Sequence, residues 1–207
     1  MKPRERQAKE KAELRRRILD AARSLFVKVG YEAATMREVA ERIGYTTTAL
    51  YYQFPDKVSL MRELCEQDLL VLSQHFNRLR KVADPIERIR MAGRAYLNFA
   101  LKHPQHYRLM FMTPHPQTAP EDMRIEKGNP SQDAYAFLLR SVSEAMEAGR
   151  FREELKDPDL LAQTLWASMH GIVALHLDQC SEKWVKWRSP AATAGIVSGP
   201  FLDGLLR

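Results

Sequence analysis

The chain has 207 residues, 45% of them hydrophobic, and a formal net charge of +6, a composition that suits one or two folded domains and excludes a disordered chain. No run approaches the ~20 apolar residues that cross a bilayer, and the charged N-terminus has no apolar signal segment. We therefore expect a cytoplasmic protein without membrane contact. Its two cysteines, Cys65 and Cys180, are too far apart in the sequence to suggest a disulfide framework or a zinc site. We expect both to be buried or half-buried thiols.

The first distinct signal along the chain is a short helix of about nine residues after Thr35. Thr35 and Glu38 have the spacing of a capping box, in which the hydroxyl accepts the amide hydrogen of residue 38 and the carboxylate accepts that of residue 35. Residues 39–43 give this helix an apolar side, and Gly44 supplies the left-handed backbone that ends many helices.

A second short helix follows the turn at Gly44. Thr46 can cap its start, Leu50 and Phe54 anchor it inward, and Pro55 ends it. Two short helices around a tight glycine turn form a helix-turn-helix, in which the start of the second helix meets base edges in the DNA major groove. The residues at that position are Thr46, Thr47 and Thr48, with Tyr51 and Tyr52 one turn later. Because the two tyrosines are about 100 degrees apart on the helix, at least one of them faces out.

A series of landmarks extends over about 45 residues. These are Ile18, Ala21, Ala22, Leu25 and Phe26 in a first helix, then Gly30-Tyr31, Thr35, Ala40, Gly44, Leu50-Tyr51, Phe54-Pro55 and Lys57. In these residues the segment resembles the N-terminal domain of TetR-family transcriptional regulators. The resemblance implies phosphate contacts from Thr35, Thr47, Tyr51 and Lys57, with Thr46, Thr48 and Tyr52 nearest the bases. Capping alone would also explain Thr35 and Thr46.

Most of the net positive charge lies in the same segment. Residues 1–57 contain 13 Lys or Arg and 8 Asp or Glu, whereas residues 58–207 contain 19 and 18. Neutralisation of phosphates by such charge gives the sequence-independent part of DNA affinity. The basic residues before the first helix are mixed with acids, so they form either a solvated helical start or an arm that orders on the DNA backbone. They are Lys2, Arg4, Arg6, Lys9 and Lys11.

From residue 56 onward, apolar residues recur every three or four positions, which predicts an all-α protein. The first helix of this part has roughly 24 residues, between positions 56 and 80. Another is expected from Asp84-Pro85 to His103-Pro104, a short one over 107–112, and one that ends at Gly149. Residues 113–130 contain four prolines and predict a long loop, with room for one helical turn at 121–126.

Residues 158–178 predict a helix that is apolar nearly all round, and such a helix needs cover on both sides. One side can pack on the protein's own core. We therefore predict a homodimer through this helix and a C-terminal helix, which Pro200 and its neighbouring glycines kink or split. The apolar residues of that last helix are Ile196, Val197, Phe201, Leu202 and Leu205.

Two patterns resemble the TetR regulators whose C-terminal domain is named for a Trp-His-Gly signature. They are Trp166-Ala-Ser-Met-His170-Gly171 and His103-Pro104-Gln-His-Tyr107-Arg108-Leu-Met-Phe111. With the N-terminal match, they imply a three-helix helix-turn-helix domain at residues 1–57 and a helical regulatory and dimerisation domain at 58–207.

A small, largely apolar effector could bind inside that second domain and shift the helix at 56–80, which would change the spacing of the two recognition helices on DNA. Aromatic, thioether and imidazole side chains suit such a pocket, although the same stripe also fits an ordinary core. The candidate wall residues are Tyr96, Phe99, His103, Tyr107, Met110, Phe111, Phe137, Trp166, Met169 and His170.

These features predict a DNA-binding regulator, and the family resemblance implies a dimeric repressor that binds a palindromic double-stranded operator and is released by its effector. The alternative is a ligand-independent adaptor on DNA whose C-terminal domain recruits a partner protein. The sequence contains no phosphate-binding glycine loop, nucleophile elbow or His-Glu-x-x-His motif, so we expect neither an enzyme nor a cofactor. His103 and His106 have no carboxylate or cysteine beside them that would complete a metal site.

Overall fold

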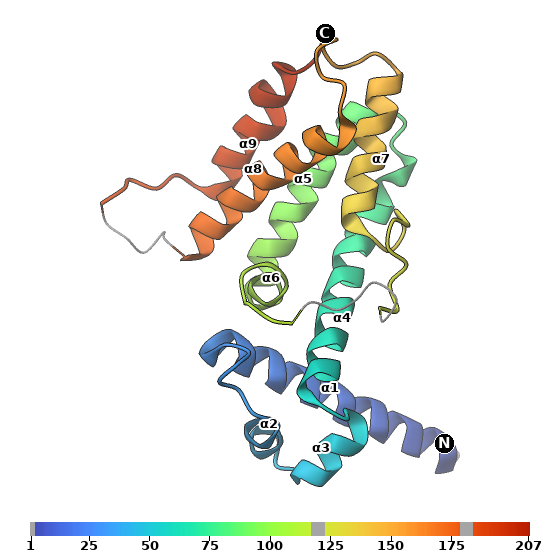
Figure 1. Ribbon diagram of the computed structural model, residues 1–207, viewed down its shortest axis with the longest axis vertical. Helices are drawn as coiled ribbons and strands as arrows, with labels where there is room; N and C mark the ends of the chain where they lie inside the picture. The colour runs from blue at the N-terminus through green and yellow to red at the C-terminus, as the bar shows by residue number, and fades with distance from the viewer. Residues whose placement is uncertain (1–2, 117–122, 179–183) are drawn as a thin grey trace. The chain divides into compact units, whose positions relative to one another are not determined.

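The computed structural model describes residues 3–116, 123–178 and 184–207, and these are arranged in helices without a β-strand, as the sequence predicts (Figure 1). The chain forms two compact units. We call residues 1–68 with 105–124 the N-terminal unit, and residues 69–104 with 125–207 the C-terminal unit.

The N-terminal unit contains α1 (Pro3–Val29), α2 (Met36–Ile43), α3 (Thr47–Gln53), the start of α4 (Lys57–Asn77) and nearly all of α6 (Pro104–Phe111). One apolar core joins them, with Ile18, Phe26, Val39, Leu50, Phe54 and Leu60 among its buried members. Leu64 of α4 and Leu109 of α6 belong to the same core. This unit therefore extends beyond the boundary expected after Lys57, because the first turns of α4 and the later α6 complete its core.

Buried acids on α4 also tie the N-terminal unit together. Asp68 is 1% exposed and accepts hydrogen bonds from Arg23 of α1 (Nη2 to Oδ1, 2.8 Å) and His106 of α6 (Nδ1 to Oδ1, 2.8 Å). Glu66, also buried, accepts the backbone amide hydrogen of Arg124 at 2.8 Å. Hydrogen bonds of this kind, to ionised groups out of water, are stronger than those between neutral groups.

The C-terminal unit is built around α5 (Pro85–Lys102), which packs against α7 (Ala134–Glu147), α8 (Pro158–Asp178) and α9 (Pro190–Ile196). Figure 1 shows α5 between these helices. The core includes Ile86, Ile89, Val142, Leu161, Leu165 and Leu202. A short antiparallel bridge between Phe151 and Leu206 brings the 150–152 segment beside the end of the described chain.

Most of the expected helices are confirmed, and their ends have the expected chemistry. Asp84 caps α5 through the amide of Ile86 at 2.9 Å, and α8 spans residues 158–178. The helix expected between 56 and 80 is α4 followed by a 3-10 turn at Arg78–Lys81. The last helix is broken as expected, because α9 continues into a π-helical segment, Val197–Phe201, in which Gly199 has non-helical dihedral angles.

The helical turn expected at 121–126 and the expected burial of the two cysteines have separate outcomes. Residues 123–126 are not helical, so the turn expected near them is not found in the described part of the loop, while residues 121 and 122 lie outside it. Cys65 is half-buried, as predicted, and Cys180 lies outside the described residues.

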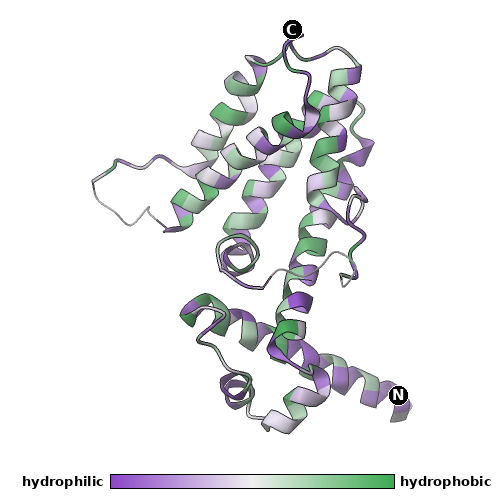
Figure 2. Cartoon of the chain, in the orientation of Figure 1, coloured by the Kyte–Doolittle hydropathy of each residue, from purple (hydrophilic) through white to green (hydrophobic). Residues whose placement is uncertain are grey.

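The expectation that no run approaches the length and apolar content of a membrane-spanning helix does not hold for α8. By length and composition, this helix of 21 residues is apolar enough to cross a membrane. Its polar residues are mostly uncharged, so they interrupt the apolar run without making the helix hydrophilic (Figure 2). The face that contains Leu161, Leu165 and Val173 is buried against the other helices of the unit.

Candidate DNA-binding surface

The start of α2 is fixed by Thr35, whose backbone is extended and whose side chain forms the predicted capping box. The amide of Glu38 donates to Thr35 Oγ1 at 3.2 Å, and the Glu38 carboxylate accepts the amide hydrogen of Thr35 at 2.8 Å and its hydroxyl hydrogen at 2.7 Å. These bonds, first from the hydroxyl and then from the amide, lower the pKa of Glu38. Thr35 itself remains exposed.

The turn between α2 and α3 also follows the prediction. Gly44 has a φ of 73°, in the left-handed region that suits glycine, and the amide of Tyr45 donates back to the carbonyl of Ala40 at 3.0 Å. Thr46 then caps α3, because its hydroxyl accepts the amide hydrogen of Ala49 at 3.2 Å.

Helix α3 has one buried and one exposed side. Leu50 and, just after the helix, Phe54 are each 1% exposed and anchor it to the core. Tyr51 is 48% exposed and Tyr52 81% exposed, and both Thr46 and Thr48 are exposed while Thr47 is half-buried. The structure therefore exposes all three expected base-facing side chains, with Thr46 and Thr48 at the start of this short, well-anchored helix and Tyr52 one turn later.

Two arginines of α1 hold the ends of the helix-turn-helix, and sequence reasoning did not single them out. Arg17 donates from Nη2 to the carbonyl of Ile43 at 2.7 Å, and its guanidinium lies 5.4 Å from the centre of the Tyr45 ring. Arg15 donates to the carbonyl of Gln53 at 2.9 Å and lies 4.1 Å from the centre of the Phe54 ring. The local sequence indicated only a basic run at residues 15–17, because these contacts join residues 26 or more positions apart.

Lys57, for which the resemblance implies a phosphate contact, binds backbone carbonyls of the N-terminal unit in this structure. Its ammonium donates to the carbonyls of Tyr31, Glu32 and Ala34 at 2.8, 3.2 and 3.1 Å, and it lies 4.4 Å from the centre of the Tyr31 ring. A lysine has three N–H donors, and all three are used in these bonds. In this conformation Lys57 fixes the α1–α2 connection instead of offering a hydrogen bond to phosphate.

The ten candidate effector residues are divided between the two units. Seven belong to the C-terminal unit, where three form a polar group among apolar neighbours. Trp166 donates from Nε1 to the hydroxyl of Tyr96 at 3.1 Å, and that hydroxyl lies 3.5 Å from His170 Nδ1. Burial lowers the pKa of His170.

The remaining four of these seven are mainly core residues. Phe99 and Phe137 are buried and contact the rings of His103 and Phe76, respectively, while Met169 is also buried. In the N-terminal unit, Tyr107 is fully buried with its ring 5.0 Å from that of Phe111, and Met110 is half-buried.

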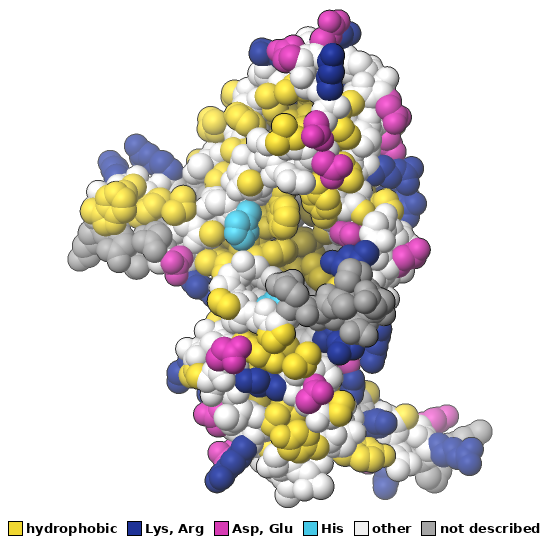
Figure 3. Space-filling model, viewed as in Figure 1, with side chains coloured by type: hydrophobic (Ala, Val, Ile, Leu, Met, Phe, Trp, Pro, Cys, Tyr) yellow, Lys and Arg dark blue, Asp and Glu magenta, His cyan; other side chains and the backbone are white. Residues whose placement is uncertain are grey.

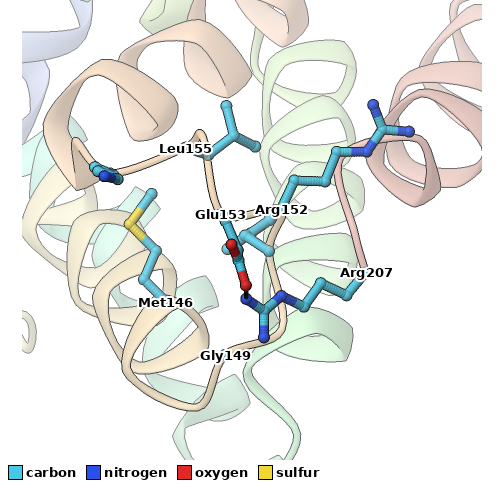
Figure 4. A pocket seen from close by; sticks show the side chains of 8 residues that line it. Met146, Gly149, Arg152, Glu153, Leu155 and Arg207 are labelled. Carbon is cyan, nitrogen blue, oxygen red and sulfur yellow. Dashed lines mark hydrogen bonds and ion pairs between the residues drawn. The ribbon is translucent and has the colours of Figure 1, made fainter.

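A surface pocket of about 380 Å³ occurs in the C-terminal unit, at a different place from the candidate residues. Figure 4 shows Met146, Gly149 and Leu155 around it, with the Glu153 carboxylate paired to Arg207. Arg152 and Lys156 complete a polar rim. None of the ten predicted effector residues lines this pocket.

Comparison with known proteins agrees with this geometry. Residues 18–64 match the family described as "Bacterial regulatory proteins, tetR family", and residues 89–183 match "Tetracyclin repressor-like, C-terminal domain". The chain is 30% identical over 195 residues to the HTH-type transcriptional activator FasR of Mycolicibacterium smegmatis, with 90% of this chain and 79% of FasR covered.

Two further similarities support the same picture. The HTH-type transcriptional repressor KstR of Rhodococcus jostii is 53% identical over 49 residues, which are 24% of this chain and 23% of KstR. The TetR family transcriptional regulator PfmR of Thermus thermophilus has the same fold, with a TM-score of 0.69 at 21% identity, over 92% of this chain and 98% of PfmR.

Proposed function

Because the chain belongs to the TetR family of bacterial transcriptional regulators, we propose that it acts as a dimer whose two α3 helices enter successive major grooves of a palindromic operator. The observation that carries this proposal is the exposed row of hydroxyl and phenol groups on a helix that is capped at one end and anchored at the other. Such groups can donate to and accept from base edges and phosphate oxygens.

Each side chain of this surface has a proposed role. Thr46, Thr48 and Tyr52 read bases, while Thr35, Thr47 and Tyr51 bind phosphates. Lys57 contributes its charge and holds the scaffold through its bonds to carbonyls. Since phosphate contacts fix the register and base contacts carry the sequence preference, substitutions in the two groups should have different effects.

Selection of bound sequences from random duplexes tests these roles. A palindrome should emerge, and Thr48→Ala or Tyr52→Ala should relax the preference at particular positions, by about 1–3 kcal/mol for each lost base contact. Lys28→Ala is the matched control, because Lys28 is an exposed cation at the end of α1. If all three variants select the wild-type sequence equally well, the proposed base readers are wrong.

The dimer is proposed to form through α8 and α9. Five large apolar side chains of α8, α9 and the Val197–Phe201 segment that follows are exposed, namely Leu160, Trp166, Leu175, Ile196 and Phe201, at 64%, 37%, 49%, 61% and 42%. Part of this surface is visible as yellow side chains over α9 in Figure 3. A β-carbon added at Gly171 or Gly195 would meet nothing within 4 Å, so the chain itself does not require glycine there. Since glycine costs helix stability relative to alanine, close approach of a second copy would account for both residues.

Gly171→Leu tests this interface, because a β-carbon added there meets nothing in one copy, whereas a leucine side chain would separate two closely packed helices. Sedimentation should show a monomer, and operator affinity should fall by about 100-fold or more, since linked binding sites gain that much from each other. Glu147→Leu, an exposed position on α7, should leave the dimer intact. A Gly171→Leu chain that stays dimeric would exclude this arrangement.

The regulatory step is proposed to be binding of a small, largely apolar molecule in the C-terminal unit, with the Tyr96, Trp166 and His170 group fixing its polar part. When this molecule binds, the protein would leave the operator, which would make the protein a repressor. KstR is a repressor by name, whereas FasR is named an activator. We further propose a cytoplasmic location, where the operator lies.

A thermal-shift screen of lipophilic and aromatic compounds tests the effector. A true effector should raise Tm and lower operator affinity in the same concentration range, because it must bind the two states of the regulator differently. Tyr96→Phe keeps the ring and removes the hydroxyl, so it should weaken binding of compounds with a polar group more than binding of purely apolar ones. A compound that raises Tm without any change in operator affinity would be a ligand but not an effector.

A further inference from the structure

The first third of α1 has no core to pack against. Residues 4–13 are all exposed, and Figure 2 colours most of this stretch as hydrophilic. The first buried residue of the helix is Ile18. Ion pairs within the helix support it locally, between Arg6 and Glu10 at 3.4 Å and between Arg16 and Glu13 at 2.6 Å.

One residue of this stretch lies beside the recognition helix. The ammonium of Lys11 is 5.9 Å from the centre of the Tyr52 ring, within the distance at which a cation is attracted to an aromatic face. Tyr52 is 81% exposed, so the pair lies at the solvent side of α3. Residues far apart in the sequence thus place a positive charge next to the most exposed aromatic residue of the candidate DNA-binding surface.

Lys11 and Lys57 both lie against aromatic rings, but their ammonium groups differ in what they bind. Lys57 uses its three donors on carbonyls. Among the described residues, Lys11 makes no hydrogen bond or ion pair, and its contact is the Tyr52 ring. Its three N–H donors therefore remain for a phosphate oxygen. Nearby acids do not neutralise it directly, because Glu10 and Glu13 pair with arginines.

We propose that Lys11 is a further DNA-contacting residue, which binds the phosphate beside the base step read by Tyr52 and holds the Tyr52 ring in its reading position. The exposed start of α1 is then a third element of the DNA surface, beside the cap of α2 and the start of α3. This inference rests on the proposed operator binding and adds to it a specific pair of residues.

The test uses the full chain and the selected operator duplex, with binding measured over a series of salt concentrations. Lys11→Gln should reduce affinity by about 3- to 10-fold near physiological salt and flatten the salt slope by about one unit, the change expected from one lost phosphate contact. Lys9→Gln is the matched control, with the same charge change on the same exposed stretch, two positions away and so on another side of the helix. It should change the slope by less than half as much.

Tyr52→Leu separates the two parts of the proposal. It removes the aromatic face that Lys11 contacts but leaves Lys11 able to bind the DNA phosphate. In that background Lys11→Gln should still flatten the salt slope but should no longer change the base preference at the position read by residue 52. Equal salt slopes for Lys11→Gln and Lys9→Gln would overturn the proposal while leaving operator binding intact. A wild-type chain that binds no duplex would overturn both.

Discussion

Different interactions dominate the candidate functional surfaces of the two units. In the N-terminal unit, hydrogen bonds from cations to carbonyls and carboxylates join the helices, as the bonds of Arg17 to Ile43 and of Arg23 to Asp68 do. In the C-terminal unit, α8 and α9 expose large apolar side chains, such as Leu160, Leu175 and Ile196, among small and polar residues. Hydrogen bonds have preferred geometry, whereas apolar attraction is non-directional. The first unit therefore suits the presentation of fixed groups, and the second suits the association and effector binding proposed above.

The strongest test of this contrast is Asp68→Ala, which removes the acceptor shared by Arg23 and His106. Arg23 is 6% exposed, so its charge would be left buried without this partner. Loss of one partner of a buried ion pair costs about 3–5 kcal/mol. We expect a decrease of that size in the free energy of unfolding, measured by urea denaturation.

Asp20→Ala is the matched control, since Asp20 also pairs with Arg23, at 3.2 Å, but has a side chain that is 56% exposed. Its effect should stay below about 1 kcal/mol, as for most exposed ion pairs. Similar losses for the two variants would mean that burial of the carboxylate does not set the strength of this contact.

The same contrast explains what the sequence could predict. The cap at Thr35, the turn at Gly44 and the cap at Thr46 each depend on residues no more than five positions apart, so local patterns were enough. Arg15 and Arg17 act over long sequence separations, and a basic run gives no sign of which carbonyls they reach.

In the C-terminal unit the helices were predictable, but the uses of their faces were not. Phe137 and Leu165 are core, Leu160 and Leu175 are exposed, and all four fit the same helical period. A stripe of apolar residues does not tell core, cavity and dimer seam apart, because all three use the same side chains. For this reason the candidate effector residues include buried core members such as Phe99.

Lys57→Met asks whether directed bonds also fix the α1–α2 connection. The variant keeps most of the side-chain length and removes three donors, so three carbonyls lose a charged partner. We expect unfolding to become easier by about 2 kcal/mol, in the range for hydrogen bonds to charged groups. The salt slope of operator binding should change by less than half a unit. A full unit of change would instead identify Lys57 as a phosphate contact.

Thr35→Ala and Thr35→Ser test how much the cap of α2 contributes to stability. The alanine variant should lose about 1 kcal/mol of stability, a typical value for an N-cap. The serine variant keeps the hydroxyl and should lose much less. Because Thr35 lowers the pKa of Glu38, the stability gained from that carboxylate is present above its ordinary pKa of 4.5 and is lost as pH falls through the lowered value. The gap between wild type and Thr35→Ala should thus narrow in acid, and a gap that does not change with pH would show that the cap acts without Glu38.

The smallest expected effect concerns the polar group of the C-terminal unit, where His170 lies beside Tyr96 and Trp166. Burial lowers the pKa of His170 below its ordinary value of 6.5, so the unfolded chain takes up a proton at a higher pH than the folded chain does. Stability from this residue is therefore complete above about pH 6.5 and decreases as pH falls toward the lowered value. His170→Asn removes the titration, so the difference in Tm between pH 7.5 and pH 5 should become smaller than in the wild type, while both proteins should respond alike between pH 7.5 and 8.5. If the Tm values of the two proteins also change alike below pH 6.5, protonation of His170 does not destabilise the folded chain. This side of the unit would then be more open to water than the apolar packing around it implies.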